Sequence, residues 1–102
     1  MQRVAIVTGS TSGIGLGIAR QLARRGAASH ILLNGFGDAA PALAAVRAAG
    51  AEAAHCGADL GTRGGVEELV AQAERWGPVE VLVGRARFFR LRFGLSAPLG
   101  RR

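Results

Sequence analysis

A glycine loop near the N-terminus holds the residues whose types and spacing could do chemistry. Its members are Thr8, Gly9, Ser10, Thr11, Ser12, Gly13, Ile14 and Gly15. Glycines let the backbone turn sharply and let a ligand approach without Cβ atoms in the way. An apolar run precedes the loop and a helical pattern follows it, so free N–H groups and a helix dipole would face a bound phosphate. The glycine spacing differs from the usual GxGxxG, and a plain strand-to-helix turn is the alternative.

The elements that must position this loop follow from the apolar pattern and the turn residues. Nearly continuous apolar runs predict strands over residues 3–8, 30–34, 53–56 and 79–83. Apolar residues at helical spacing predict helices over residues 13–25, 39–49 and 63–76. The apolar stripe of the first helix is predicted to contain Ile14, Ile18 and Leu22. The alternation predicts an α/β fold, the N-terminal half of a Rossmann-type doubly wound parallel sheet, with about four strands in the order 3-2-1-4 and three helices.

The glycine loop resembles the cofactor loop of the short-chain dehydrogenase/reductase family, which has a Thr-Gly pair followed by Gly-Ile-Gly. More narrowly, residues 8–19 and the segment Leu-Asn-Gly-Phe-Gly-Asp at 33–38 are similar to the D-3-hydroxybutyrate dehydrogenase branch of that family. The resemblance extends from about Val4 to Val83. It implies an NAD-dependent oxidoreductase that moves hydride between NAD and a 3-hydroxy acid, with residues 8–15 holding the cofactor.

Two later segments would, by the same resemblance, contact the adenosine of NAD. Phe36, in the loop after the second strand, would lie against the adenosine; alternatively it is a small apolar staple within a turn. Asp59 and Leu60 match the family's pair at the adenine edge; alternatively Asp59 only begins a turn. NAD-binding folds often carry an acidic residue at the end of the second strand. This chain has Asn34 there, and no arginine in the loop to receive a 2′-phosphate.

The catalytic pair of the family, Tyr-x-x-x-Lys, has no counterpart in this sequence. The chain has no tyrosine, and all thirteen of its basic residues are arginine. Ser10 and Ser12 have no His or Lys base at a suitable spacing. His55 and Cys56 are adjacent and would point to opposite faces of a strand, which argues against a metal pair. We therefore predict no catalytic residue and no metal site, and expect a cofactor-binding fragment that is inactive alone.

The last nineteen residues differ in charge from the rest of the chain. Residues 1–83 carry seven arginines and seven acidic residues, whereas residues 84–102 carry six arginines and no acid. We expect residues 1–83 to form a partial NAD-binding domain and residues 84–102 an irregular basic tail, which a reading-frame shift or a mis-called gene end near residue 84 would explain. Tail contacts with nucleic acid or with an anionic membrane are less favoured alternatives. The alternation of apolar residues with arginine over 89–95 would also suit an edge strand.

Location and partners follow from the remaining features. The single cysteine, Cys56, cannot form an internal disulfide, and the N-terminus has no signal-peptide pattern, so we expect a cytoplasmic protein. The open edge of the fourth strand could pair with a second copy or with another partner. The alternative function is therefore a non-catalytic nucleotide-binding or interaction module. A small hydroxy acid would be bound only by a full-length relative.

Overall fold

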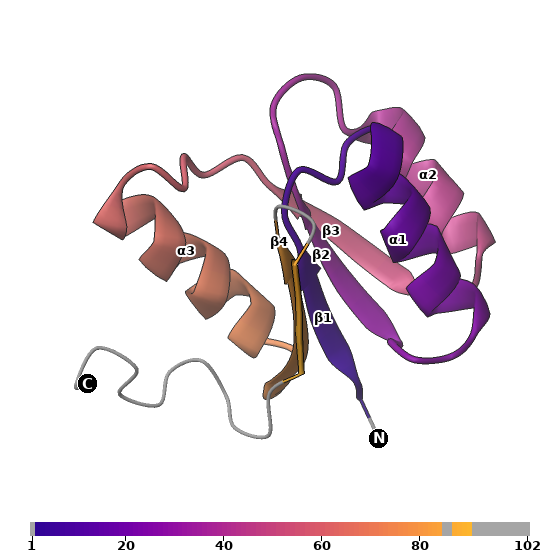
Figure 1. Ribbon diagram of the computed structural model, residues 1–102. Helices are drawn as coiled ribbons and strands as arrows, with labels where there is room; N and C mark the ends of the chain where they lie inside the picture. Colours follow the sequence, from indigo (N-terminus) through magenta and orange to yellow (C-terminus); the bar gives the residue numbers. More distant parts are fainter. Residues whose placement is uncertain (1, 85–86, 91–102) are drawn as a thin grey trace.

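The computed structural model describes residues 2–84 and 87–90, which form one mixed sheet between two helical layers (Figure 1). The parallel strands are β1 (Val4–Val7), β2 (His30–Asn34), β3 (Glu52–Cys56) and β4 (Val79–Gly84). The helices are α1 (Gly13–Arg24), α2 (Ala40–Ala48) and α3 (Arg63–Glu74). A further strand, β5 (Arg87–Arg90), runs antiparallel to β4.

The parallel strands confirm the predicted doubly wound arrangement. Their order is β3-β2-β1-β4, and β5 follows β4. Helices α1 and α2 cover one face of the sheet, and α3 covers the other (Figure 1). Strand β1 therefore has β2 on one side and β4 on the other, and the strand order reverses beside it. In open α/β sheets, ligands bind beyond the C-terminal ends of the strands at such a reversal.

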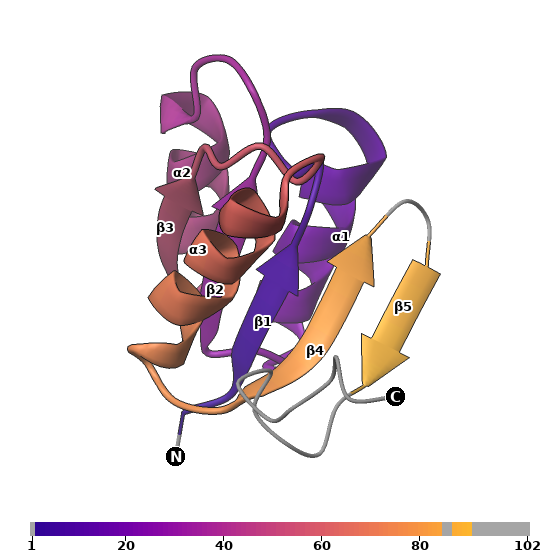
Figure 2. The same cartoon turned by 90° about the vertical axis from the view of Figure 1, so that its left-hand side faces the viewer.

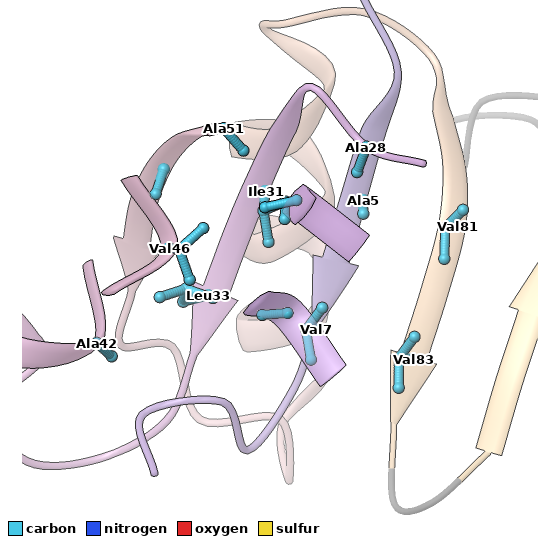
Figure 3. Packing of buried hydrophobic residues seen from close by; sticks show 13 residues of the cluster. Ala5, Val7, Ala28, Ile31, Leu33, Ala42, Val46, Ala51, Val81 and Val83 are labelled. Carbon is cyan, nitrogen blue, oxygen red and sulfur yellow. The ribbon is translucent and has the colours of Figure 1, made fainter. Parts of the chain in front are cut away.

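The pleat of the strands divides the buried side chains between the two faces. One core cluster lies under α1 and α2 and includes Val7, Ile31 and Leu33 (Figure 3). The other lies under α3 and includes Ile6 and Leu32 from the same two strands. Because neighbouring residues point to opposite faces, a strand covered on both sides has to be apolar throughout. This explains the continuous apolar runs in the sequence.

The apolar stripe of α1 is partly different from the prediction. Ala19 and Ala23 are buried, and Ile18 and Leu22 pack partly against the core. Ile14, by contrast, is 80% exposed. The helix turns by about 100° per residue, so a residue nine positions before Ala23 lies on the opposite side of the helix. Ile14 therefore points away from the core, at the end of the helix that follows the glycine loop.

The segment after β4 is not wholly irregular, which corrects the predicted tail. Strand β5 pairs with residues 81–84, with Val81 opposite Arg90 and Gly84 opposite Arg87 (Figure 2). The sequence offers an edge strand over residues 89–95 as one alternative, and β5 shares residues 89 and 90 with that range. The sequence predicts an open edge on β4 that could pair with a partner. In the structure β5 occupies that edge, so it is not open. The other tail residues, 85, 86 and 91–102, lie outside the described residues.

The opposite edge of the sheet, strand β3, receives hydrogen bonds from side chains of two helices. Arg47 on α2 donates from Nη2 to the carbonyl oxygen of Ala53 at 2.9 Å. Gln72 on α3 donates from Nε2 to the carbonyl oxygen of His55 at 3.5 Å. Alternate carbonyls of an edge strand point outward, where another chain could pair with them. These two side chains therefore occupy carbonyl acceptors on β3 that could otherwise pair with a strand of another molecule.

Replacing Arg47 with alanine should lower the free energy of unfolding by about 1 kcal/mol, because the Ala53 carbonyl loses its donor. It should also increase self-association at the β3 edge. Urea denaturation measures the first effect and sedimentation velocity the second. Arg20→Ala, on the exposed side of α1, is the control and should change stability by less than about 0.5 kcal/mol. Unchanged stability and sedimentation of Arg47→Ala would contradict the protective role.

Candidate functional site

Three loops meet at the C-terminal ends of β1, β2 and β3, and together with the first turn of α1 they contain every residue predicted to bind a cofactor. The first loop joins β1 to α1, the second joins β2 to α2, and the third joins β3 to α3 (Figure 1). Hydrogen bonds connect the end of β2 and the loop after it to the other two regions. Thr11 Oγ1 donates to the carbonyl oxygen of Phe36 at 3.1 Å. Asn34 Nδ2 donates to the carbonyl oxygens of Cys56 at 2.9 Å and Ala58 at 3.1 Å.

The glycines of the first loop and of the first turn of α1 serve two different purposes. Gly9 and Gly13 have φ angles of +61° and +63°, a backbone region that side chains with a Cβ rarely adopt. Cβ atoms built on these two residues would meet nothing within 4 Å, so the space beside them is open. A Cβ on Gly15 would instead collide with the carbonyl oxygen of Gly9 and lie 2.9 Å from its carbonyl carbon. Gly15 therefore allows α1 to begin directly against the loop.

The N-terminus of α1 has no side-chain cap. Ser12 occupies the N-cap position with extended backbone angles, and its side chain makes no capping hydrogen bond. The first turn carries no acidic residue, while Ile14 projects from it into solvent. The first N–H groups of a helix have no partner within the helix. Open space beside two glycines and an uncapped helix start together fit an anionic group such as a pyrophosphate.

The other hydroxyl side chains of this loop hold the loop itself. Ser10 is fully buried, donates to the carbonyl oxygen of Val7 at 2.6 Å and accepts from the N–H of Asn34 at 3.0 Å. Thr8 Oγ1 lies 3.3 Å from the carbonyl oxygen of Val83 on β4. Thr11 is bonded to the second loop. A ligand would therefore depend on main-chain N–H groups more than on these three hydroxyls.

Phe36 stands out from the second loop. Its side chain is 78% exposed, which does not suit the alternative of an apolar staple within the turn. The backbone around it is closely constrained, because a Cβ on Gly35 would lie 2.7 Å from Thr11 Oγ1. Gly37 adopts a φ of +88°. The loop thus presents an exposed aromatic ring next to the glycine loop.

The third loop contains Asp59 and Leu60. Asp59 Oδ1 accepts from the N–H of Gly61 at 2.8 Å, and the Asp59 carbonyl accepts from Thr62 Oγ1 at 2.9 Å. Leu60 packs against the core under α3. Thr62 caps α3 by accepting from the N–H of Gly65 at 2.9 Å. Asp59 therefore does begin a turn, and contact of this pair with an adenine stays a prediction.

Sequence reasoning missed the two polar residues that join the loops. The sequence marks Asn34 only as a position lacking an acidic residue, yet it is 5% exposed and its amide donates to the carbonyls of Cys56 and Ala58. The sequence singles out His55 only as a candidate metal ligand, yet its Nε2 lies 2.9 Å from the carbonyl oxygen of Gly35. The available signal was a polar residue at the end of a buried apolar strand, because such a residue needs a hydrogen-bond partner.

Metal-ligand clusters and membrane-spanning helices are both absent from residues 2–84 and 87–90. In that part of the chain, no three His, Cys, Asp or Glu side chains gather as a metal site. Within the same residues, every helix is too short or too polar to cross a membrane.

Comparison with known proteins places residues 3–91 in a match to the family described as short chain dehydrogenase. The match continues past Val83, where the resemblance was expected to end. A D-beta-hydroxybutyrate dehydrogenase from Cupriavidus necator is 44% identical over 87 residues, which cover 82% of this chain and 33% of that protein.

Two solved structures of similar proteins hold nicotinamide cofactors. A variant of actinorhodin polyketide ketoreductase, solved with NADPH, has a TM-score of 0.73 and 41% identity, covering 82% of this chain and 33% of its own. An NADH-dependent reductase complexed with NAD has a TM-score of 0.69 and 33% identity, covering 79% and 34%. The chain thus spans about one third of the length of the relatives it matches.

Proposed function

The chain belongs to the short-chain dehydrogenase family, and from this membership we propose that it binds NAD at the start of α1. The uncapped N-terminus of α1 beside the open glycines Gly9 and Gly13 carries this proposal. Within residues 8–15, the N–H groups of Thr8 and Ser10 already donate to the carbonyls of Val83 and Asn34, so main-chain N–H groups of the other residues would hold the pyrophosphate. Phe36 would contact the adenosine, and Asp59 with Leu60 would border the adenine. In this arrangement most of the binding energy comes from the pyrophosphate and the adenosine half of the dinucleotide.

We further propose that the nucleotide is NAD rather than NADP. Residues 34–38 contain no cationic side chain, and Asp38 adds a negative charge to that loop. A 2′-phosphate would carry its own negative charge into this region without an arginine to receive it. Related structures hold NAD in one case and NADPH in another, so affinity for the two nucleotides has to be compared directly.

The whole reaction to which this site would belong is oxidation of a small hydroxy acid, as suggested by the similar D-beta-hydroxybutyrate dehydrogenase. Bound NAD would supply the hydride acceptor. The 102 residues contain neither tyrosine nor lysine, so they offer no counterpart of the family's proton-transfer pair. We therefore propose that this polypeptide by itself binds the nucleotide without turning over a substrate.

A free, buried Cys56 fits a reducing compartment such as the cytoplasm.

Titration calorimetry with NAD and with NADP tests the proposal. Saturable binding of NAD, with weaker binding of NADP, is expected. An assay of NADH formation with 3-hydroxybutyrate should show no turnover. Absence of any binding would refute the nucleotide site, tighter binding of NADP would refute the preference, and NADH formation would refute the inactivity of the isolated chain.

Replacing Phe36 with alanine should weaken NAD binding about tenfold, because base–aromatic stacking contributes about 1–3 kcal/mol. The free energy of unfolding should change by less than about 0.5 kcal/mol, since the ring is exposed. Calorimetry and urea denaturation measure the two effects. Val66→Ala, a partly exposed apolar residue on α3, is the control and should leave NAD affinity unchanged. Wild-type affinity of the Phe36 variant would exclude its contact with adenosine.

A further inference from the structure

The loop that carries Phe36 is fixed by hydrogen bonds to two successive carbonyls. His55 on β3 holds the carbonyl of Gly35, with Nε2 at 2.9 Å from the oxygen. Thr11 in the glycine loop holds the carbonyl of Phe36 at 3.1 Å. The loop is thus attached through Gly35 to β3 and through Phe36 to the glycine loop.

His55 is well supported for holding a loop. It lies within β3, which pairs along its whole length with β2, and its side chain is half-buried. The adjoining backbone is fixed as well, because Asn34 Nδ2 donates to the carbonyls of Cys56 and Ala58. A carbonyl oxygen can only accept a hydrogen bond, so Nε2 of His55 has to carry the proton. The hydrogen bond therefore defines the tautomer of this ring.

We propose that His55 is a positioning residue that presents Phe36 to the adenosine half of the dinucleotide. This inference rests on the proposed function. Glycines flank Phe36 on both sides, and glycine loses more conformational entropy than any other residue when it is ordered. A loop that is already ordered before the ligand arrives does not lose this conformational entropy during binding. His55 therefore increases affinity without touching the nucleotide.

The test compares two substitutions at this position. His55→Phe keeps a planar ring but removes the donor, and should weaken NAD binding about tenfold. His55→Gln keeps an N–H at a similar reach and should restore most of the affinity. Wild-type affinity of His55→Phe, while the wild-type chain binds NAD, would overturn the inference and leave the proposed function intact. Failure of the wild-type chain to bind would refute the proposed function, and the positioning role with it.

A double-mutant cycle with Phe36→Ala separates positioning from a general structural effect. If His55 acts through Phe36, His55→Phe should have little further effect on affinity when Phe36 is already alanine. Additive losses would overturn the inference. Trp76 packs on His30 with ring centroids 5.1 Å apart, and His30 begins β2 at the end opposite to the Phe36 loop, so Trp76 fluorescence reports unfolding at a distance from the loop.

The tautomer provides a measurement that needs no variant. The sequence contains two histidines, so nitrogen-15 spectra of the wild-type rings are simple to assign. A proton on Nε2 of His55 is expected. A proton on Nδ1 alone would leave the Gly35 carbonyl without its donor and would overturn the inference, even if His55→Phe fails to fold.

Discussion

Replacing Gly15 with alanine should lower the free energy of unfolding by about 3 kcal/mol, whereas Gly17→Ala should raise it by about 1 kcal/mol. A Cβ on Gly15 would strike the carbonyl of Gly9 and lie 3.1 Å from Cα of Ser10, so main-chain atoms would have to move. A Cβ on Gly17, in the same helix, would meet nothing within 4 Å and would favour the helical backbone. Urea denaturation followed by Trp76 fluorescence measures both changes.

The same pair of variants tests whether the contact between helix and loop matters for the nucleotide. Gly15→Ala should lose NAD binding, because α1 can no longer begin against the loop and its N–H groups are displaced. Gly17→Ala should bind like the wild type. Equal stability of the two variants would show that the close approach of Gly15 to Gly9 is not required for folding.

Replacing Asn34 with aspartate should lower the free energy of unfolding by about 3 kcal/mol at neutral pH. The change introduces the acidic residue that many NAD-binding folds carry at this position, so a simple family argument would expect better NAD binding. Here the amide Nδ2 donates to the carbonyls of Cys56 and Ala58, and a carboxylate can only accept. Two carbonyls would lose their donor and face a buried charge. Thermal or urea denaturation measures the loss, and calorimetry should show weaker NAD binding.

Asp38→Asn is the matched control for this substitution. It makes the reverse exchange of the same two residue types four positions later, in the loop after β2, where Asp38 is exposed and accepts from the N–H of Ala40. An asparagine oxygen can accept that bond, so stability should change by less than about 0.5 kcal/mol. The deficit of Asn34→Asp should be smaller at about pH 4, where a partly protonated carboxyl can donate one hydrogen bond. Wild-type stability of Asn34→Asp at neutral pH would contradict the role assigned to Asn34.

Most of the fold could be predicted because its signals are local in the sequence. The bounds of β2 at His30 and Asn34 were predicted correctly, since an apolar run ends there between turn residues. The start of α1 at Gly13 was also predicted, from the glycine loop before it. Ile14 was misplaced on the buried stripe because spacing by four residues drifts around a helix, and the sequence does not mark where the core lies.

The candidate site was predicted only in part, for a related reason. Residues 8–15, Phe36, Asp59 and Leu60 could be named because they match a family pattern, whereas their contacts with a nucleotide stay predictions. Polar residues that connect separate loops leave no periodic pattern. His55 and Gly35 are twenty positions apart, and their hydrogen bond exists only because β2 and β3 pair in one register.

The sequence by itself determined the alternation of strands and helices, the apolar strands and the glycine loop, since each depends on neighbouring residues. Only the tertiary structure decided that Asn34 holds two carbonyls, that His55 fixes the Phe36 loop, and that β5 covers the edge of β4. Those features depend on strand register and on which loops meet at the end of the sheet. Such contacts form between residues distant in the chain, where no local preference specifies them.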